Sequence, residues 1–377
     1  MNWLHTLLKT VRTKRKVHAF VIFSMVSLQT MGFTPAATTQ IYLPLVANPA
    51  PPQGLWTSKN ELAGLPTSGA AWDRLKTEAD LAATTPTLGD QDSDVNTIVL
   101  AKALVYARTG TAKYRDQVVA ALNIITYNNT ENGGRTLAVG RKLAAYVIAA
   151  DLINLSSYNA NLDAAFRAKL RELLDKPFEA EVGKKNLRET HEKRPNNWGT
   201  HAGASRIAVA LYLGDKAELA QAAAVFHGYL GNHAAYDGFN FGDDLSWQAD
   251  PAHPVGINPP GATKNGQPID GVMPDDMRRG GPFQAPPAFT GYPWEALQGA
   301  VVQAELLERA GYPAWSWENN ALLRAVQYLY KVGWTPQADD RWIPCLINHA
   351  YRTNLPIDPE ATPGKNMGFA CWTDVGR

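Results

Sequence analysis

Cysteine is scarce in this chain of 377 residues, which contains only Cys345 and Cys371. Two cysteines are too few for a disulfide framework or a cysteine-rich metal site. They can form one bridge in an exported protein or remain two separate buried thiols. The sequence also lacks the His-x-x-x-His and Glu-x-x-His pairs of metal sites, the Gly-x-Ser-x-Gly elbow of α/β-hydrolases and a phosphate-binding glycine loop. We therefore assign no metal and no cofactor.

Long uninterrupted apolar runs are also missing. Residues 17–31 are mostly apolar, but they are interrupted by His18, Ser24, Ser27 and Gln29. This stretch follows a basic segment and precedes small residues at 34–36, which is typical of an export signal rather than of a permanent membrane span. We interpret residues 1–36 as a signal peptide and expect a secreted or periplasmic protein without membrane contact after cleavage.

Charge of one sign is not in excess. The chain has 36 basic and 35 acidic side chains, and the signal peptide takes away five basic and no acidic ones, which leaves a net charge of about −4. This is not the composition of a nucleic-acid-binding protein. An anionic polymer would have to bind through a local basic patch.

Strand-like alternation is absent, and helical periodicity takes its place. Residues 37–54 are rich in proline and are interpreted as a linker, so the folded domain is expected over residues 55–377. In this domain apolar residues recur every three or four positions, which indicates helices. The expected helices cover residues 96–109, 113–125, 135–155, 162–174, 202–213, 217–230, 294–310 and 317–332. This pattern favours an all-α array of antiparallel helical hairpins.

The segment NNWGTH at residues 196–201 stands at the start of the expected helix at 202–213. Asn196 or Asn197 can cap that helix. If the helix has begun, Asn197 and His201 lie four residues apart on one face. A neutral amide can donate to a substrate carboxylate, and an imidazole can exchange a proton near neutral pH. The alternative is an N-cap followed by a packed histidine.

The helical periodicity stops in residues 236–291, and a loop of this length inside a domain is usually functional. Its segment DDMRRGG, residues 275–281, offers Arg278 and Arg279 for bidentate contact with a carboxylate. Tyr292 follows just ahead of a helix, where a phenol close to an arginine can act as a base. The alternative is a salt-bridged loop in which the neighbouring aspartates neutralise the arginines.

Tryptophan is abundant after residue 197, where eight of the eleven are found. Sugar rings stack on such faces, although most tryptophans are expected in the core. We take Trp198 and Trp247 as candidates for substrate contact, together with His253 in a proline-rich loop.

Residues 196–215, NNWGTHAGASRIAVALYLGD, resemble the Asn-Asn-His-Gly-Thr-Trp motif and the following apolar helix of the alginate-lyase superfamily. Residues 137–153, LAVGRKLAAYVIAADLI, and the pairing of an arginine loop with a later tyrosine resemble the same family. The resemblance covers most of residues 55–335. It implies an (α/α) toroid whose central cleft binds uronate polymers and cleaves them by β-elimination, without a cofactor. We expect an acidic polysaccharide as the partner of a monomeric enzyme.

Carried over to this sequence, the resemblance implies that Asn197 binds the substrate carboxylate, Tyr292 is the catalytic base and acid, and Arg279 assists them. Asn196 is the neighbouring candidate for substrate binding. Arg278 is a second such candidate and the second choice for the arginine.

One position departs from the family pattern. Trp198 stands where the family usually has histidine, and an imidazole follows three positions later at His201. We expect His201 to take the catalytic role, with His191 or His253 as the other choices. This departure and the long spacing from Arg279 to the tyrosine indicate a divergent subgroup that acts on glucuronan or mixed uronates.

Two other functions stay open at this point. A helical-toroid glycoside hydrolase would use paired carboxylates from Asp243, Asp244, Asp275 or Asp276. A non-catalytic module would bind the polysaccharide through tryptophan faces and the arginine loop.

Overall fold

The structure is a computed structural model that describes residues 54–82, 85–180 and 183–374. The chain divides into a unit of Met1–Ala47 and a unit of Asn48–Arg377. The predicted signal peptide and all but the last residue of the predicted linker lie outside the described residues. The described residues all belong to the second unit.

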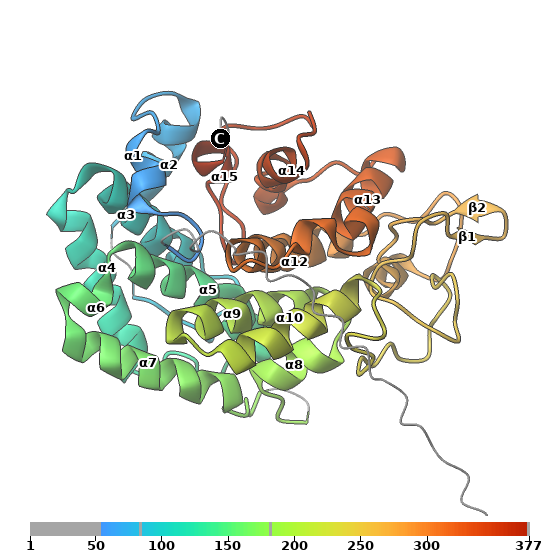
Figure 1. Cartoon of the computed structure of the whole chain (residues 1–377), viewed down its shortest axis with the longest axis horizontal. Helices are drawn as coiled ribbons and strands as arrows, with labels where there is room; N and C mark the ends of the chain where they lie inside the picture. The colour runs from blue at the N-terminus through green and yellow to red at the C-terminus, as the bar shows by residue number, and fades with distance from the viewer. Residues whose placement is uncertain (1–53, 83–84, 181–182, 375–377) are drawn as a thin grey trace, which may run out of the picture. The chain divides into compact units, whose positions relative to one another are not determined.

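The regular secondary structure of the described residues is almost entirely helical (Figure 1), so the all-α class is confirmed. The α-helices are α1 (Lys59–Ala63), α2 (Ala70–Asp80), α3 (Val95–Thr109), α4 (Ala112–Tyr127), α5 (Thr136–Leu152), α6 (Leu155–Tyr158), α7 (Ala160–Asp175), α8 (Leu187–Lys193), α9 (Asn197–Leu213), α10 (Lys216–Leu230), α11 (Pro274–Met277), α12 (Tyr292–Arg309), α13 (Trp317–Lys331), α14 (Ile343–Tyr351) and α15 (Ala370–Thr373). Three 3₁₀ turns are η1 (Arg278–Gly280), η2 (Ala314–Ser316) and η3 (Ala338–Asp340). A two-stranded antiparallel hairpin joins β1 (Thr263–Lys264) to β2 (Gln267–Pro268).

The eight helices expected from periodicity are all present, and the toroid stays a prediction. The helix after the asparagine pair begins at Asn197, five residues earlier than expected. The helices that periodicity did not reveal are mostly short, such as α8, which depends on a capping box between Asn186 and Glu189 rather than on an apolar stripe.

The long segment expected to lack helical periodicity is mostly irregular, and buried side chains hold its turns. Asn258 donates through Nδ2 to the Trp247 carbonyl at 3.0 Å and accepts the Ala249 N–H at 3.2 Å. The Trp247 ring packs edge-on against Phe283, with ring centres 4.9 Å apart. A buried amide and a buried indole therefore replace regular backbone hydrogen bonding here.

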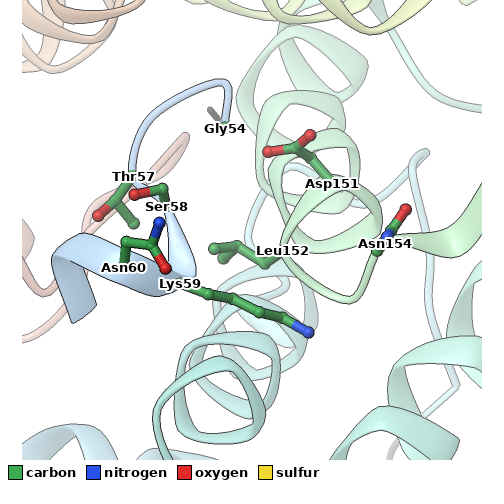
Figure 2. Close-up of a pocket in the computed structure, with 8 residues that line it drawn as sticks. All are labelled: Gly54, Thr57, Ser58, Lys59, Asn60, Asp151, Leu152 and Asn154. Carbon is green, nitrogen blue, oxygen red and sulfur yellow. The ribbon is translucent and has the colours of Figure 1, made fainter. Parts of the chain in front are cut away.

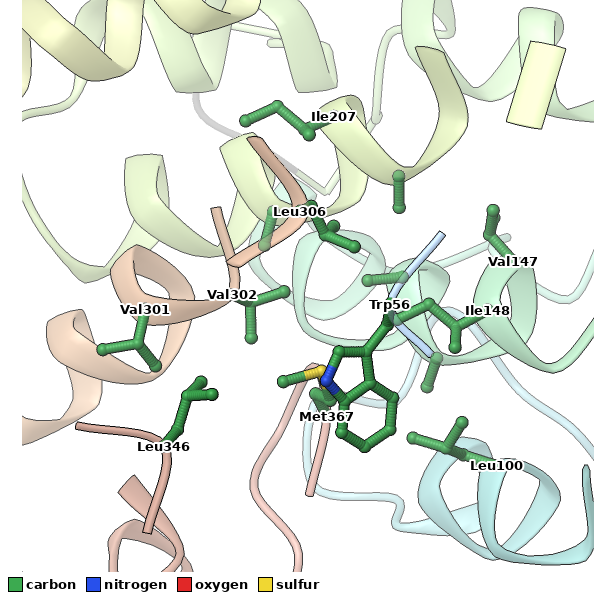
Figure 3. Packing of buried hydrophobic residues seen from close by; sticks show 14 of the residues in the cluster. Trp56, Leu100, Val147, Ile148, Ile207, Val301, Val302, Leu306, Leu346 and Met367 are labelled. Atoms are coloured by element: carbon green, nitrogen blue, oxygen red, sulfur yellow. The ribbon is translucent and has the colours of Figure 1, made fainter. Parts of the chain in front are cut away.

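The core lies where α5, α9 and α12 pack together (Figure 1). Two glycines permit this approach. A Cβ added to Gly140 on α5 would lie 3.0 Å from the Ala202 nitrogen, and one added to Gly299 on α12 would lie 2.4 Å from the Thr200 carbonyl carbon. Figure 3 shows the apolar side chains that fill the space between these helices. Those from the three helices include Val147, Ile148, Ile207, Val301, Val302 and Leu306, all fully buried.

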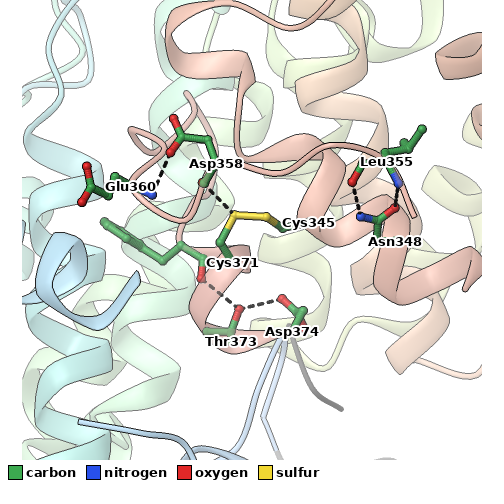
Figure 4. Close-up of a disulfide and its surroundings, with 9 residues drawn as sticks. Cys345, Asn348, Leu355, Asp358, Glu360, Cys371, Thr373 and Asp374 are labelled. Atoms are coloured by element: carbon green, nitrogen blue, oxygen red, sulfur yellow. Dashed lines mark hydrogen bonds between the residues drawn. A yellow bond between two sulfur atoms is a disulfide. The ribbon is translucent and has the colours of Figure 1, made fainter. Parts of the chain in front are cut away.

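The C-terminal segment packs against the first helices of the described chain. Trp372 on α15 lies against Trp72 on α2, with ring centres 5.3 Å apart, and its indole N–H donates to the Pro66 carbonyl at 2.9 Å. Cys345 and Cys371 form a disulfide that ties α14 to α15 (Figure 4), which settles the alternative between a bridge and two thiols. Within the described ranges, no helix has both the length and the apolar character needed to cross a bilayer.

Candidate functional site

The N-terminus of α9 is anchored by two aspartates from α11. Asn196 caps the helix by accepting the Trp198 N–H at 3.1 Å, and its amide donates to Asp275 Oδ2 at 2.7 Å. The Asn197 N–H donates to Asp276 Oδ1 at 3.1 Å. A helix N-terminus favours anionic or acceptor groups because its first N–H groups lack intrahelical partners. Here the protein's own carboxyl groups supply them, and Asn196 serves as a cap and anchor.

The two aspartates have different environments. Asp275 accepts the Arg278 Nε–H at 2.8 Å, so part of the predicted salt-bridged loop exists. Asp276 is fully buried, and this burial, together with the charge of Asp275, raises the pKa of Asp276 well above its usual value. Burial therefore favours the protonated, uncharged form of Asp276.

His201 lies one turn after Asn197 and has no exposed surface. Its Nδ1 contacts Asn366 Oδ1, and its Nε2 lies 3.0 Å from Glu295 Oε1. Burial lowers the pKa of His201, while the hydrogen bond with Glu295 opposes that shift. The imidazole is occupied at both nitrogens and cannot touch a sugar in this arrangement.

Glu295 joins three helices. Its Oε1 contacts His201 from α9 and also forms an ion pair with Arg141 from α5. Burial alone would raise the pKa of this carboxyl, but the His201 hydrogen bond, the charges of His201 and Arg141, and that of nearby Lys365 lower it to about 2. Glu295 is consequently ionised over the physiological range.

Tyr292 is the first residue of α12 and is 41% exposed. The guanidinium carbon of Arg279 lies 5.1 Å from the centre of the Tyr292 ring. Arg279 is exposed, and in residues 54–82, 85–180 and 183–374 no ion pair joins it to a carboxylate. Glu295 follows Tyr292 by three residues, so the two lie on neighbouring positions of one helix surface.

These contacts bring the principal candidates to one place. Asn197 and His201 lie one turn apart on α9, and His201 contacts Glu295, which lies one turn from Tyr292 on α12. The loop carrying Arg279 is held to the start of α9 by the two aspartates. The structure therefore assembles phenol, guanidinium, amide and imidazole at the N-terminal ends of two packed helices.

A cavity of about 370 Å³ is lined by none of the predicted site residues, but its lining includes the chain neighbours of Arg141 and Asn366. Lys365, which lines it, directly precedes Asn366, and its charge acts on Glu295. Lys142 also lines it, and burial, with the charges of Lys365 and Arg141, lowers the pKa of Lys142 to about 8. The basic lining consists of Arg74, Lys142, Arg341 and Lys365. Acidic residues line the same cavity, so its overall charge is mixed.

The other aromatic and histidine candidates lie in different surroundings. Trp198 is half-buried, and the Arg194 guanidinium lies 4.2 Å from its ring centre. Trp247 is 2% exposed and donates its indole N–H to the Gly281 carbonyl at 2.9 Å, so it packs the loop and offers no face to a sugar. His253 is exposed and pairs with Asp250 at 2.8 Å, away from the cluster. His191 is buried, with Nδ1 3.5 Å from Arg206.

Another hollow, of about 220 Å³, lies between α1 and the end of α5 (Figure 2). Lys59 and Asp151 line it, and Asp151 Oδ2 accepts the Leu55 N–H at 2.9 Å. Its lining contains none of the predicted site residues.

Sequence reasoning missed three members of the cluster: Arg141, Glu295 and Asn366. Arg141 was visible as a charge within the apolar run of residues 137–153, and a buried charge inside a helix calls for a partner. Glu295 was visible three residues after Tyr292. Asn366 carried no local signal, because its partners are far away in the sequence.

A metal site and a hydrolase that uses two carboxylates would each need their side chains gathered at the site. Across the described part of the chain, no group of three or more His, Cys, Asp or Glu side chains is placed to hold a metal ion. Asp243 and Asp244 lie exposed in the loop, whereas Asp275 is committed to Asn196 and Arg278.

A phenol and a guanidinium beside a buried acid–base network are groups that can transfer a proton on an anionic substrate. Residues 80–241 match the family model described as Alginate lyase. The match identifies this region as an alginate-lyase-like domain and indicates a polysaccharide lyase that acts on an alginate-like substrate. It includes α9 and ends before α12, so Tyr292 and Glu295 lie beyond it. No curated protein matches the chain.

Proposed function

We propose that this chain is an exported lyase that cleaves a uronate polysaccharide, either alginate (including polymannuronate) or glucuronan, by β-elimination with Tyr292 as base and acid. The observation that carries the proposal is the exposed Tyr292 phenol, whose ring centre lies 5.1 Å from the Arg279 guanidinium and one turn from the Glu295–His201 pair. A reactive phenol must be accessible, and among the four principal candidates only Tyr292 and Arg279 are exposed.

In the proposed reaction, the deprotonated Tyr292 takes the proton from C5 of the uronate. The C5–H electron pair becomes the C4–C5 double bond, and the C4–O glycosidic bond breaks with its electrons on the leaving oxygen. The same phenol then gives its proton to that oxygen, which returns Tyr292 to its starting form. No water or external reductant enters this balance.

Negative charge moves onto the C6 carboxylate as the proton departs, so groups that stabilise this charge lower the barrier. Arg279 is the exposed cation beside Tyr292, and we assign it this role, with Arg278 restrained by Asp275. Asn197 is the second group. Its side-chain Nδ2 is the atom that can donate to a carboxylate, whereas its Oδ1, buried without a hydrogen-bond partner among the described residues, can only accept.

His201 acts in this proposal through Glu295 rather than by contact with the sugar. Its complete burial and its two contacts make it a positioning residue. We assign the 370 Å³ cavity to neighbouring sugar units; Lys142 lines it, and Lys365 there is paired with Asp339 at 2.8 Å. Trp198, half-buried at the start of α9, is the tryptophan that supports stacking.

The test is incubation of the purified protein with alginate, polymannuronate, polyguluronate and glucuronan, followed by product sizing. A lyase produces ultraviolet absorbance from the new double bond conjugated to the carboxylate. New reducing ends without that absorbance would favour a hydrolase, and binding without shorter products would favour a binding module. Either of these results contradicts the proposal.

A further inference from the structure

The segment between Cys345 and Cys371 contains two residues that act at the site, Lys365 and Asn366. The Lys365 N–H donates to Gln298 Oε1 on α12 at 2.6 Å, and the Lys365 carbonyl accepts from Asn96 Nδ2 on α3 at 2.8 Å. Asn366, the next residue, is fully buried. The segment is therefore pinned between two helices at the point where it meets the cluster.

The orientation of the Asn366 amide is fixed by its surroundings. Its Nδ2 donates to the Gly140 carbonyl on α5 at 2.6 Å, and a carbonyl can only accept. The other end, Oδ1, must then face His201 Nδ1, as it does. Since an amide oxygen only accepts, Nδ1 of His201 must carry a hydrogen.

This choice of tautomer has a consequence at the other nitrogen. Nε2 of His201 faces Glu295 Oε1 at 3.0 Å, and a carboxylate oxygen is also an acceptor. With Nδ1–H committed to Asn366, the contact with Glu295 is attractive only when a further proton lies between Nε2 and Oε1. Asn366 thereby fixes Nε2 as the nitrogen of His201 at which a further proton can bind beside the ionised Glu295.

The charges around that proton come from several elements. Arg141 on α5 pairs with the same Glu295 oxygen, and Lys365 acts on it from the C-terminal segment. Asp340 in η3 is the acidic neighbour, and its Oδ1 accepts from Gln298 Nε2 at 2.7 Å. Two cations and one carboxyl group therefore face the pair.

The disulfide is the covalent restraint on this segment. Cys345 and Cys371, 26 positions apart in the sequence, are both buried, and the described residues 352–369 between them form no helix (Figure 4). A bridge across such a stretch removes many conformations that the open chain would otherwise sample. We propose that Asn366 is a positioning residue for the lyase reaction and that the Cys345–Cys371 disulfide holds it against His201. This inference rests on the proposed function.

The first experiment compares Asn366→Ala with Asn348→Ala. Asn348 lies in the same segment and bonds to Leu355 at 2.9 Å and 2.7 Å, but it does not contact His201 (Figure 4). For Asn366→Ala we expect a loss of kcat of about tenfold to a hundredfold, the range found when a residue that orients a functional histidine is removed. KM should stay within about twofold, because Asn366 is buried away from the sugar. Asn348→Ala should keep the wild-type kcat.

Nitrogen NMR of the imidazole rings, with His201 assigned by its absence in His201→Gln, gives a readout that loss of stability does not imitate. Wild type should show a protonated Nδ1, and Asn366→Ala should lose that preference and shift the acid limb of the pH–kcat profile. A folded Asn366→Ala protein with unchanged His201 signals and unchanged kcat overturns the inference.

The second experiment removes the bridge, by a thiol reductant and by the double change Cys345→Ser and Cys371→Ser. We expect kcat and the His201 signals to move toward those of Asn366→Ala while the helical circular dichroism is kept. Reduced, folded protein with wild-type kcat and ring signals refutes the role of the disulfide. If no polymer is cleaved by the wild type, the proposed function fails, and the ring NMR of Asn366→Ala alone then decides the placement of His201.

Discussion

The two ends of the α9–α12 pair are stabilised differently. Toward their C-terminal ends, Ile207, Val302 and Leu306 fill space with apolar carbon and require only a fitting shape. At their N-terminal ends, His201 and Glu295 need partners from α5 and from the C-terminal segment. Buried polar groups are costly without partners, so they are retained where chemistry uses them. The difference indicates that the polar end was kept for function and the apolar end for stability.

The largest expected effect comes from the phenol at the polar end. Tyr292→Phe removes the proposed base and acid without removing buried volume, so kcat should fall by about 10²-fold to 10⁴-fold. The melting temperature should change little, because Tyr292 is 41% exposed. Tyr127→Phe, at an exposed phenol at the end of α4, is the matched control. Comparable activity of both variants would remove Tyr292 from the mechanism.

The second largest effect is expected from Gly299, where α12 packs closely against α9 between the two ends. Gly299→Ala would place a methyl group 2.4 Å from the Thr200 carbonyl carbon and 2.5 Å from the His201 nitrogen, both backbone atoms. Overpacking of this kind costs about 1–3 kcal/mol, and here it also moves His201. Denaturant unfolding measures the loss of stability. Gly214→Ala is not a suitable control because of its left-handed backbone, whereas Gly64→Ala meets no atom within 4 Å and has an ordinary φ.

A smaller effect concerns Asp340 at the edge of the polar end. Burial, with the charges of Asp339 and Glu295, raises the pKa of Asp340 to about 8, although the Gln298 hydrogen bond opposes this. A carboxyl whose folded pKa is raised stabilises the fold below its unfolded pKa, and this contribution is lost as pH rises through 8.

Asp340→Asn keeps the acceptor for Gln298 and cannot ionise. Each pKa unit corresponds to about 1.4 kcal/mol, and because Asp340 is only half-buried we expect a gain of about 1–2 kcal/mol at pH 9 relative to pH 4. Thermal unfolding of wild type and variant at both pH values measures it. An equal difference at both pH values would contradict the raised pKa.

The smallest effect is expected at the buried aspartate behind α9. Burial favours the uncharged form of Asp276, and the amide oxygen introduced by Asp276→Asn would still accept the Asn197 N–H, so this change should alter kcat by less than about twofold. A paired-carboxylate hydrolase would instead lose nearly all activity with the same substitution. The initial rate on the cleaved polymer distinguishes the two cases.

Local pattern was enough to predict the elements, because apolar spacing reports a helix wherever one face is buried. It also led to Asn197, His201 and Tyr292, which stand beside helix starts. The local pattern did not reveal that α9 begins at Asn197. The N–H of Asn197 is accepted by Asp276, which lies 79 positions away in the sequence, so nothing near residue 197 signals this helix start. Nor could the local pattern assign partners for the charges in α5.

The site's remaining members depend on contacts between distant parts of the chain. Arg141 meets Glu295 across 154 positions, and Asn366 meets Gly140 across 226. Such pairings follow from how helices stack and leave no periodic trace in the sequence. For Trp247 the sequence-based prediction was wrong. A tryptophan can stack on a sugar ring, but the side chain of Trp247 is buried within the loop and contacts the loop itself.

The raised pKa of Asp276 has a consequence for how an acidic polymer reaches this surface. Two ionised aspartates at the mouth of α9 would repel every approaching uronate unit, and Arg278 alone would offset just one of them. The raised pKa of Asp276 favours a form in which the helix start keeps its hydrogen-bond acceptor without a second negative charge. The polymer therefore meets a surface at the start of α9 where the charges of Asp275 and Arg278 offset each other. The exposed Arg279 then supplies the net attraction for the substrate carboxylates.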